Sequence, residues 1–494
     1  MSTTHAGSPH ERWAHFRFAI VGPLLAAPPA RGTLREQLAR LAQTPWRHPI
    51  TEAPVAFGVS TIERWYYAAR RTAHDPVGVL RRRRRQDAGQ QPSLSLALRQ
   101  ALRAQYRAHT SWSYQLHADN LAVLATETPT LGSMPSYATI RRFLKTQGLL
   151  PQRRLPRRST PGTEQAAARL EAREVRSFQA EYVHGLWHLD FHAGSRPVLT
   201  RPGVWVTPHL LGVLDDCSRV ACHVQWYLAE TAETLVHALA QAIQKRQLPR
   251  ALLTDNGSAM VAAETTQGLA DLGIVHETTL PYSPYQNAKQ EVFWAQVEGR
   301  LVAMLEGCRE LTLERLNEAT QAWVEGEYHQ TLHSELGTSP LRRYLAGPEV
   351  GRPSPSSDAL RRAFRAKVPR QQRRSDGTVS LEGRRFEIPS RYRHLGRLWV
   401  RYARWDLSRV DLVDEHTGAI LCALYPLDKI RNAEGQRRRL APVAAAEAEA
   451  LDPTSAPAAE LAPLLRKLMA DYAATGLPPA YLPLHPPNQE EPTR

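Results

Sequence analysis

The spacing of apolar residues changes along the chain and separates three kinds of segment. Up to about residue 150, apolar residues recur every three or four positions, the period of amphipathic helices. From 183 to 300, short apolar runs typical of buried strands alternate with helical patterns. From 376 to 430, apolar and polar residues alternate between frequent turn signals, which predicts a small β-barrel domain at 374–432.

The N-terminal pattern predicts two all-α helix-turn-helix units, at 1–85 and 90–150. In the first unit, Thr33 with Glu36 and Ser60 with Glu63 have the spacing of capping boxes. The last helix of each unit has one apolar face and one basic face. The basic residues, which we expect to bind DNA, are Arg64, Arg70 and Arg71 in the first unit and Arg141, Arg142 and Lys145 in the second.

Charge supports the DNA-binding interpretation of these units. The chain carries a net charge of +15, and residues 1–160 hold 24 basic against 8 acidic residues, whereas the remainder is close to neutral. Such a concentration is the electrostatic footprint of a nucleic-acid-binding region. The run Arg81–Arg85 is expected to be a flexible linker that touches phosphates. The alternative is a pair of three-helix bundles with a basic, soluble surface and no role in DNA binding.

The remaining segments outside the centre are a linker and a tail. Residues 151–180 begin basic and proline-rich, which predicts an extended linker, and continue as a helical spacer. Residues 433–494 are rich in Ala and Pro, and we expect one amphipathic helix in an otherwise disordered tail. The sequence has no apolar run of about 18 residues, no signal-peptide layout and no CxxC motif. We therefore expect a cytoplasmic protein without a membrane partner.

The central segment, 181–346, predicts an α/β domain with the element order β-β-β-α-β-α-β-α, and three acids lie at prominent places in it. Asp190 is in the middle of an apolar strand, Asp255 ends a buried strand, and Glu291 begins a helix. An acid in an apolar strand is costly unless something pairs with it. Mg²⁺ takes hard oxygen ligands, so three converging carboxylates suit it. Each acid taken alone is more often a turn cap.

Neighbouring polar residues allow other interpretations. Asp215 and Asp216 lie in a predicted hairpin turn and are interpreted as structural. His188 and His192 share a strand face with Asp190, where they are polar neighbours or, less often, metal ligands. Four further residues lie in the surroundings: Asn256 and Lys289 flank the acids and are candidate DNA contacts, while Trp187 and Trp294 are expected in the core rather than as base-stacking platforms.

Five stretches of the central segment together resemble the superfamily of DDE transposases and retroviral-type integrases. They are WHLDF, VLDDCSR, LLTDNGS, LPYSPYQNAKQEVFW and YHQTLHSELGTSP, and 35 residues separate Asp255 from Glu291, as in the D,D-35-E group. The resemblance implies a ribonuclease-H-like catalytic core at 181–346. The flanking helical units and the barrel resemble, more loosely, parts of bacterial insertion-sequence and Mu-like transposases.

The resemblance also implies a mechanism. Asp190, Asp255 and Glu291 would hold two Mg²⁺ ions, for which Mn²⁺ can substitute. A metal-activated water would cleave the transposon end and free a 3′-OH, which would then join target DNA by transesterification. The implied partners are the transposon ends and target DNA, further copies of the chain on that DNA, and an ATPase that selects the target through the C-terminal tail. The implied location is the bacterial nucleoid.

Four positions depart from the family pattern. Ala288 stands where glycine is usual, Gln290 and Val292 replace a common valine and arginine, and His329 replaces a frequent asparagine. No proposed metal ligand is lost, so we expect activity. Two alternatives have different consequences. One is a catalytically silent or domesticated transposase that acts as a sequence-specific DNA-binding regulator. The other is a ribonuclease-H-like nuclease without a joining step.

Overall fold

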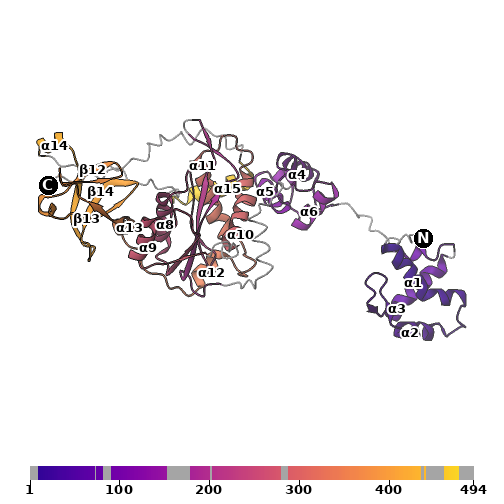
Figure 1. Ribbon diagram of the computed structural model, residues 1–494. Coiled ribbons are helices and arrows are strands. Elements are labelled where there is room, and N and C mark those ends of the chain that lie inside the picture. Colours follow the sequence, from indigo (N-terminus) through magenta and orange to yellow (C-terminus); the bar gives the residue numbers. More distant parts are fainter. Residues whose placement is uncertain are drawn as a thin grey trace, which may run out of the picture. The chain divides into compact units, whose positions relative to one another are not determined.

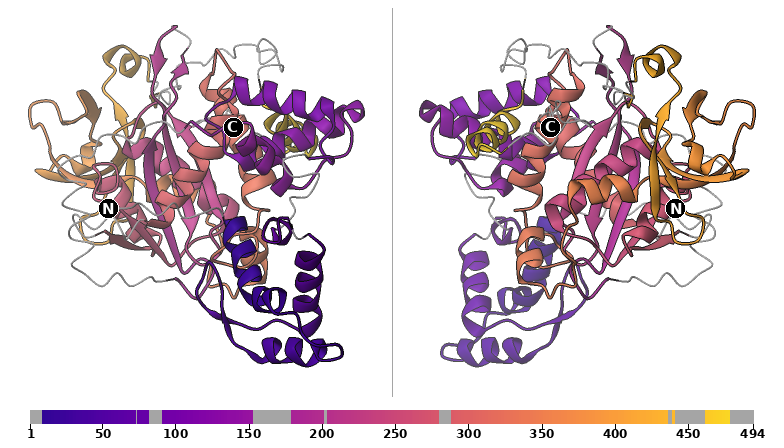
Figure 2. Two further views of the ribbon diagram at one scale, coloured as in Figure 1. Left: turned by 90° about the vertical axis from the view of Figure 1, so that its right-hand side faces the viewer. Right: turned by 90° about the vertical axis from the view of Figure 1, so that its left-hand side faces the viewer.

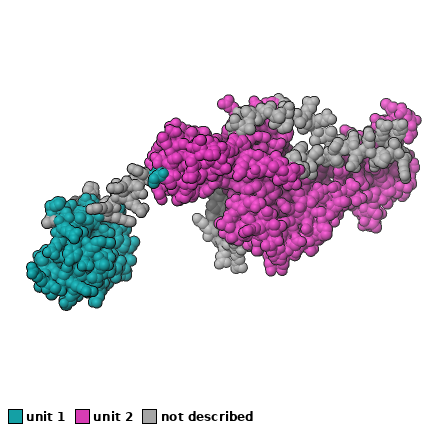
Figure 3. Space-filling view, turned by 180° about the vertical axis from the view of Figure 1, so that it is seen from behind, with its two compact units in different colours: residues 1–92 teal, residues 93–494 magenta. Residues whose placement is uncertain are grey.

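A computed structural model shows two compact units, residues 1–92 and 93–494, which Figure 3 distinguishes by colour. It describes residues 9–72, 74–81, 91–152, 179–200, 203–279, 288–435, 439–440 and 461–477. Most of the predicted linker, the arginine run after Arg81, the turn before Glu291 and the flanks of the predicted tail helix lie outside these ranges. Every helix within them is too short or too polar to cross a lipid bilayer.

The first unit is a bundle of three helices whose core uses the predicted apolar face of the last helix. Ile62, Trp65, Tyr66 and Ala69 are all buried, and they pack with Ile20 and Leu38 from the other two helices. The elements are α1 (Pro9–Ala26), α2 (Leu34–Gln43), α3 (Val59–Arg71), the strand pair β1 (Trp46–Arg47) and β2 (Pro54–Val55), and the 3₁₀ turn η1 (Gly78–Leu80).

The two capping boxes predicted in this unit are wrong. Thr33 has helical backbone angles and makes no side-chain cap, and Glu36 pairs with Arg40 instead, at 2.6 Å. Helix α3 begins directly after Gly58, so Ser60 lies inside its first turn rather than before it. The sequence pattern also missed helix α1, because its apolar residues are spread around the helix instead of forming one stripe.

A second three-helix domain follows, formed by α4 (Leu96–Ala108), α5 (Tyr114–Glu127) and α6 (Tyr137–Thr146), with the 3₁₀ turn η2 (Pro129–Leu131). Ile140, Phe143 and Leu144 face inward as predicted. His117 of α5 is fully buried, and the side-chain amide nitrogen of Gln105 lies 3.1 Å from its Nδ1. An amide can donate to that nitrogen only when it carries no proton. Burial, and then neighbouring His109, lower the pKa of His117 to about 4.

The central sheet has five strands in the order β7-β6-β3-β8-β9. Strand β6 is antiparallel to both β3 and β7, whereas β8 is parallel to both β3 and β9. The predicted order of strands and helices is confirmed: β3 (Leu186–Ala193), β6 (His209–Asp215), β7 (Ala221–Tyr227), α8 (Ala232–Arg246), β8 (Ala251–Thr254), α9 (Ala263–Asp271), β9 (Val275–Thr278) and α10 (Ala288–Gln296), with a small hairpin, β4 (Val198–Leu199) and β5 (Trp205–Val206), inserted after β3.

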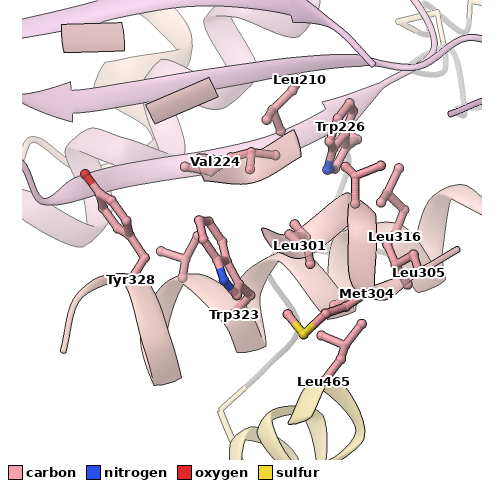
Figure 4. Close-up of a cluster of buried hydrophobic side chains, with 14 of the residues drawn as sticks. Leu210, Val224, Trp226, Leu301, Met304, Leu305, Leu316, Trp323, Tyr328 and Leu465 are labelled. Atoms are coloured by element: carbon pink, nitrogen blue, oxygen red, sulfur yellow. The ribbon is translucent and has the colours of Figure 1, made fainter. Parts of the chain in front are cut away.

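Helices cover both faces of this sheet, and the alternation of side chains along β3 separates the two faces (Figure 1). Trp187 and Leu189 point into a cluster that includes Leu239 of α8 and Leu269 of α9. The other cluster, shown in Figure 4, lies between the opposite face and the helices that follow β9. These are α10, the π-helical turn η4 (Val297–Val302), α11 (Leu313–Trp323) and the π-helical turn η5 (Val324–Tyr328).

The predicted tail helix is present as α15 (Pro463–Ala474), and it packs back onto the central domain and helix α5. Its fully buried Leu465 joins the cluster of Met304 and Trp323 (Figure 4). The backbone nitrogen of Leu464 donates to Asn120 Oδ1 at 2.9 Å, which ties the helix to α5. Figure 2 shows this yellow helix among the purple helices of the second helical domain from both sides. One segment from the end of the chain thus joins two domains.

The C-terminal β-rich region is a nearly closed barrel of six strands in the order β10-β13-β14-β15-β12-β11. It begins at Ala366, earlier than the predicted barrel, because the first strand carries few apolar residues. Its elements are α12 (Pro340–Ala346) and α13 (Ser357–Ala363) leading in, then β10 (Ala366–Gln371), β11 (Thr378–Leu381), β12 (Arg384–Glu387), η6 (Ser390–Tyr392), β13 (Arg397–Ala403), β14 (Asp406–Val413), β15 (Ile420–Pro426) and α14 (Lys429–Ala433).

The docking of α15 predicts that truncating Leu465 loosens helix α5. Leu465→Ala removes a fully buried side chain, which costs roughly 3 kcal/mol at a well-packed site. We expect faster amide hydrogen exchange in α15 and α5, measured by mass spectrometry on the full chain. Leu477→Ala is the matched control, because Leu477 is 58% exposed. Unchanged exchange in α5 would show that the two helices are not coupled.

The lowered pKa of buried His117 predicts that the second helical domain loses stability in acid. Its folded pKa lies below its ordinary value of 6.5, so the unfolded chain binds the proton more readily. The stability that neutral His117 provides is complete above about pH 6.5 and declines as the pH falls towards 4, by up to about 3 kcal/mol. We expect local opening of α5, measured by hydrogen exchange, to increase over this window. His117→Gln should flatten the pH dependence, and an equally steep profile in that variant would contradict the assignment.

Candidate active site

Asp190 lies within strand β3, and Asp255 directly follows the end of β8, the parallel neighbour of β3. The pairing of β3 with β8 sets Trp187 opposite Leu252 and His188 opposite Leu253. The paired residues end there, and the same register continued by two residues would set Asp190 level with Asp255. Neighbouring strands are about 4.8 Å apart. The sheet therefore brings the segments that carry these two acids side by side, although the acids are 65 positions apart in the sequence.

The turn after β8 uses part of the Asp255 carboxylate. Asp255 is half-buried, and its Oδ1 accepts a hydrogen bond from the backbone nitrogen of Gly257 at 2.9 Å. Asn256 is exposed, and its side-chain nitrogen donates to the Thr279 carbonyl oxygen at 2.8 Å, which ties the turn to the end of β9. Asp255 thus stabilises the turn through Oδ1. Among the residues that the structure describes, none forms a hydrogen bond with its Oδ2.

Helix α10 rests on a glycine that is directly opposite Asp190. In the antiparallel ladder of β3 and β6, Asp190 pairs with Gly212. The side-chain nitrogen of Gln290 donates to the Gly212 carbonyl oxygen at 2.8 Å. A Cβ atom on Gly212 would lie 2.6 Å from the Trp294 ring, so only glycine lets the helix approach this closely. Trp294 Nε1 also lies 3.5 Å from Asp190 Oδ2.

Glu291 follows Gln290 in this helix, and its side chain is exposed. Helix α10, which carries Glu291, therefore packs against the strand pair β3 and β6, which contains Asp190. Within the described residues, however, no group of three or more Asp, Glu, His or Cys side chains is close enough to hold a metal ion. The predicted metal centre of Asp190, Asp255 and Glu291 therefore stays a prediction.

The two aspartates of the hairpin turn have different environments. Asp215 Oδ2 accepts hydrogen bonds from the backbone nitrogen and hydroxyl of Ser218, at 2.8 and 2.6 Å, as predicted for a turn residue. Burial raises its pKa. Asp216 instead contacts His188 of β3 and Lys289 of α10. Burial alone would raise the pKa of Asp216, but these hydrogen bonds outweigh burial and hold the pKa well below its usual range.

The second histidine of β3 contacts the far end of the same helix segment. His192 stacks on Trp294, with ring centroids 5.4 Å apart, and its Nε2 lies 3.2 Å from Glu298 Oε1. Both histidines are therefore polar neighbours that join β3 to the helix. Trp187 and Trp294 are buried in the core, as expected. Glu298 was not singled out from the sequence, because nothing in the helical pattern distinguishes it from a surface acid.

His329, which departs from the family pattern, has a defined structural role. It is fully buried, and its Nε2 accepts a hydrogen bond from the Ala221 backbone nitrogen at 3.1 Å. Its Nδ1 lies 3.0 Å from Glu325 Oε2. The imidazole thus fixes the start of strand β7 to the helical layer, through one accepting and one donating nitrogen.

The predicted DNA-contact residues lie on helices α3, α6 and α10 and, for Asn256, in the turn after β8. Those on α3 and α6 are exposed: Arg64, Arg70, Arg71, Arg141, Arg142 and Lys145. Arg70 lies 5.9 Å from the centroid of the Tyr66 ring. Lys289 is the exception, because its ammonium forms an ion pair with Asp216 inside the central domain. A DNA contact stays a prediction for all of them.

Comparison with known proteins identifies the central segment. Residues 181–284 match the family model described as integrase core domain. This match includes Asp190 and Asp255 and ends before Glu291. No curated protein matches the chain.

Solved structures of retroviral integrases are similar to parts of the chain. The HTLV-2 integrase catalytic core domain in complex with magnesium is 18% identical, with 33% of this chain and 97% of that chain covered and a TM-score of 0.27. The BIV integrase catalytic core domain is 21% identical, with 33% and 94% covered and a TM-score of 0.25. The simian T-cell lymphotropic virus intasome in complex with PP2A regulatory subunit B56 gamma is 13% identical, with 65% and 98% covered and a TM-score of 0.31. Likenesses this low carry no argument about function.

The close packing of Trp294 of α10 against Gly212 predicts that Gly212→Ala destabilises the central domain. The new methyl group must displace the Trp294 ring, and such overpacking costs roughly 1–3 kcal/mol. We expect a lower denaturation midpoint by tryptophan fluorescence and faster hydrogen exchange in α10. Gly299→Ala, in the next helical turn, is the control, because nothing lies within 4 Å of its added Cβ. Equal stability of the two variants would show that α10 can shift without cost.

Proposed function

From the premise that its central domain belongs to the superfamily of DDE transposases and retroviral-type integrases, we propose that this protein is a DNA transposase. It cleaves transposon ends to free 3′-OH groups and joins them to target DNA by metal-dependent transesterification. An integrase core domain supports a function in DNA integration or transposition. The observation that supports the proposal is the parallel pairing of β3, which carries Asp190, with β8, which Asp255 follows, together with the packing of α10, which carries Glu291, against Gly212 opposite Asp190.

The donor chemistry of the three acids suits the proposed metal ions. Carboxylate oxygens are the hard ligands that Mg²⁺ and Mn²⁺ prefer, and the segments that carry Asp190 and Asp255 are neighbours in the sheet. Asp190, Asp255 and Glu291 would hold the two ions. When bound, the ions would activate an attacking oxygen and stabilise the leaving one at phosphorus.

The chain's own residues would prepare the site for this chemistry. The turn bond from Gly257 fixes one oxygen of Asp255, so that its carboxylate has a defined orientation. The seat of α10 on Gly212 sets the distance between helix and sheet, and therefore the position of Glu291. The exposed arginines of α3 and α6 would neutralise DNA phosphates and hold the transposon ends.

The proposed partners follow from the same function. The protein would act as a homo-multimer on DNA, because two transposon ends must be cut and joined together. An ATPase that selects target DNA would contact the C-terminal tail. The apolar face of α15 packs against Trp323 and Met304, so that contact would use its exposed face, or the helix would first undock.

A second candidate is a catalytically silent transposase that acts as a DNA-binding regulator. The exposed basic residues on two separate helical domains favour it as much as they favour an enzyme. It has no need for acids at Asp190, Asp255 and Glu291, and all three are retained in the sequence. The transposase is therefore the better proposal.

The proposed role of Asp255 as a metal ligand predicts that the Asp255→Asn variant loses DNA cleavage. DNA that spans the flanks of the gene is incubated with the purified protein and Mg²⁺, and strand nicking and joining to a plasmid are followed. We expect end-specific nicks and joined products from the wild type, and a decrease of about 10³-fold in the variant, since a metal ligand is worth several kcal/mol. Asp471→Asn is the matched control, because Asp471 is an exposed acid of α15.

The outcomes separate the candidates. Products that disappear only with Asp255→Asn support the transposase and map its ends. Specific DNA binding without products from either wild type or variant would contradict the transposase proposal and favour the regulator. Nicks without any joined product would favour the nuclease.

A further inference from the structure

The Asp216 carboxylate is the meeting point of three segments of the central domain. It is fully buried, and its Oδ1 receives both His188 Nε2, at 2.6 Å, and the ammonium of Lys289. Its Oδ2 accepts a hydrogen bond from the backbone nitrogen of Ala180 at 2.5 Å and lies 3.9 Å from an Arg219 guanidinium nitrogen. This is more than a hairpin turn needs, since Asp215 already stabilises the turn itself.

The two side chains on Oδ1 stand in the same sequence relation to the proposed acids. His188 precedes Asp190 by two positions, and Lys289 precedes Glu291 by two positions. In a strand, residues two apart share a face, so His188 and Asp190 point to the same side of β3. In a helix, residues two apart point in different directions, so Lys289 can anchor the first turn of α10 while Glu291 points elsewhere.

A single anion therefore connects the strand of the first acid to the helix of the third. Gln290 and Trp294 fix the same helix to Gly212, but they define only its distance from the sheet. A helix held on one side can still rotate or slide along its axis. The Lys289–Asp216 ion pair supplies a second, lateral point of attachment in the turn that contains Glu291. With both attachments, the turn of the helix that carries Glu291 is held against rotation and sliding.

We propose that Asp216, with Lys289 and His188, positions Glu291 relative to Asp190, and that Lys289 acts through this network rather than by contacting DNA. The proposal rests on the proposed function, because it assigns Glu291 to the acid triad. Asp216, Lys289 and His188 are positioning residues. They touch neither the DNA nor the reacting atoms, and their effect is on the geometry of the helix.

Burial explains why the network is suited to this task. The side chains of Asp216 and His188 are 0% and 1% exposed, and that of Lys289 is 16% exposed. A charge that is removed from water holds its partner in one geometry more firmly than a surface pair does. Without Lys289, Asp216 keeps His188, Ala180 and Arg219 as partners. The fold should therefore survive Lys289→Met, while the helix loses its lateral attachment.

The test is a double-mutant cycle on the full chain. The variants are Lys289→Met, Asp216→Asn and the double variant. For each we measure three quantities: the rate of single-turnover nicking with Mg²⁺, the Kd for end DNA at several salt concentrations, and hydrogen exchange in α10. A misplacement of about 1 Å costs on the order of 10²-fold in rate, so each single variant should nick roughly 10- to 100-fold more slowly. The double variant should be no slower than the slower single variant. DNA affinity and its salt dependence should not change.

Two matched variants sharpen the comparison. Lys289→Arg keeps a cation that can reach Asp216 and should recover most of the nicking rate. Lys467→Met removes an exposed lysine from α15 and should change nothing. If Asp216→Asn fails to fold, the contrast between Lys289→Met and Lys289→Arg, with hydrogen exchange in α10, decides the question alone.

Three results would overturn the proposal. The first is a Lys289→Met variant with weaker DNA binding and a salt slope reduced by about one, which identifies a phosphate contact. The second is a set of additive effects in the cycle, which identifies independent roles. The third is unchanged exchange in α10. If the wild type neither nicks nor joins DNA, the proposed function fails, whereas exchange in α10 still tests whether the network holds the helix.

Discussion

A residue without a side chain in the middle of a buried strand decides where helix α10 can lie. Gly212 leaves room for the Trp294 ring and exposes a carbonyl oxygen to Gln290. Any larger residue would push the helix away from the sheet. Because Gly212 pairs with Asp190, this close approach of helix and sheet is directly opposite the first proposed acid. The spacing of the candidate site thus depends on this one contact.

Around this contact, a strip of polar side chains crosses an otherwise apolar layer. His188, Asp190 and His192 alternate along β3 with Trp187 and Leu189, which fill the opposite core. Buried polar groups are costly unless they are paired, and here His188 contacts Asp216 while His192 contacts Glu298. These contacts offset the cost of burying the polar side chains, and they also connect strand β3 to the helical layer. Stability and alignment of the site therefore come from the same contacts.

The C-terminal helix shows that the parts of the chain do not act as separate modules. Leu465 joins the core cluster of Met304 and Trp323, and the backbone nitrogen of Leu464 donates to Asn120 of the second helical domain. A helix from the tail therefore stabilises the attachment of a proposed DNA reader to the proposed catalytic domain. A change at any of these three places is expected to reach the other two through packing.

The sequence by itself determined the order of elements in the central domain, the presence of two N-terminal helical domains and of a C-terminal barrel, and the acids that lie in the central domain. These follow from local rules: apolar periodicity gives strands and helices, and the motifs around Asp190 and Asp255 carry the resemblance that the integrase core match supports. The capping boxes at Thr33 and Ser60 failed, because a cap depends on where the helix begins, which neighbouring helices decide. The docking of α15, the seat on Gly212 and the Asp216 network were decided only by the tertiary structure. Each joins residues that are far apart in the chain, and no local pattern records which distant partner fills a given space or balances a given charge.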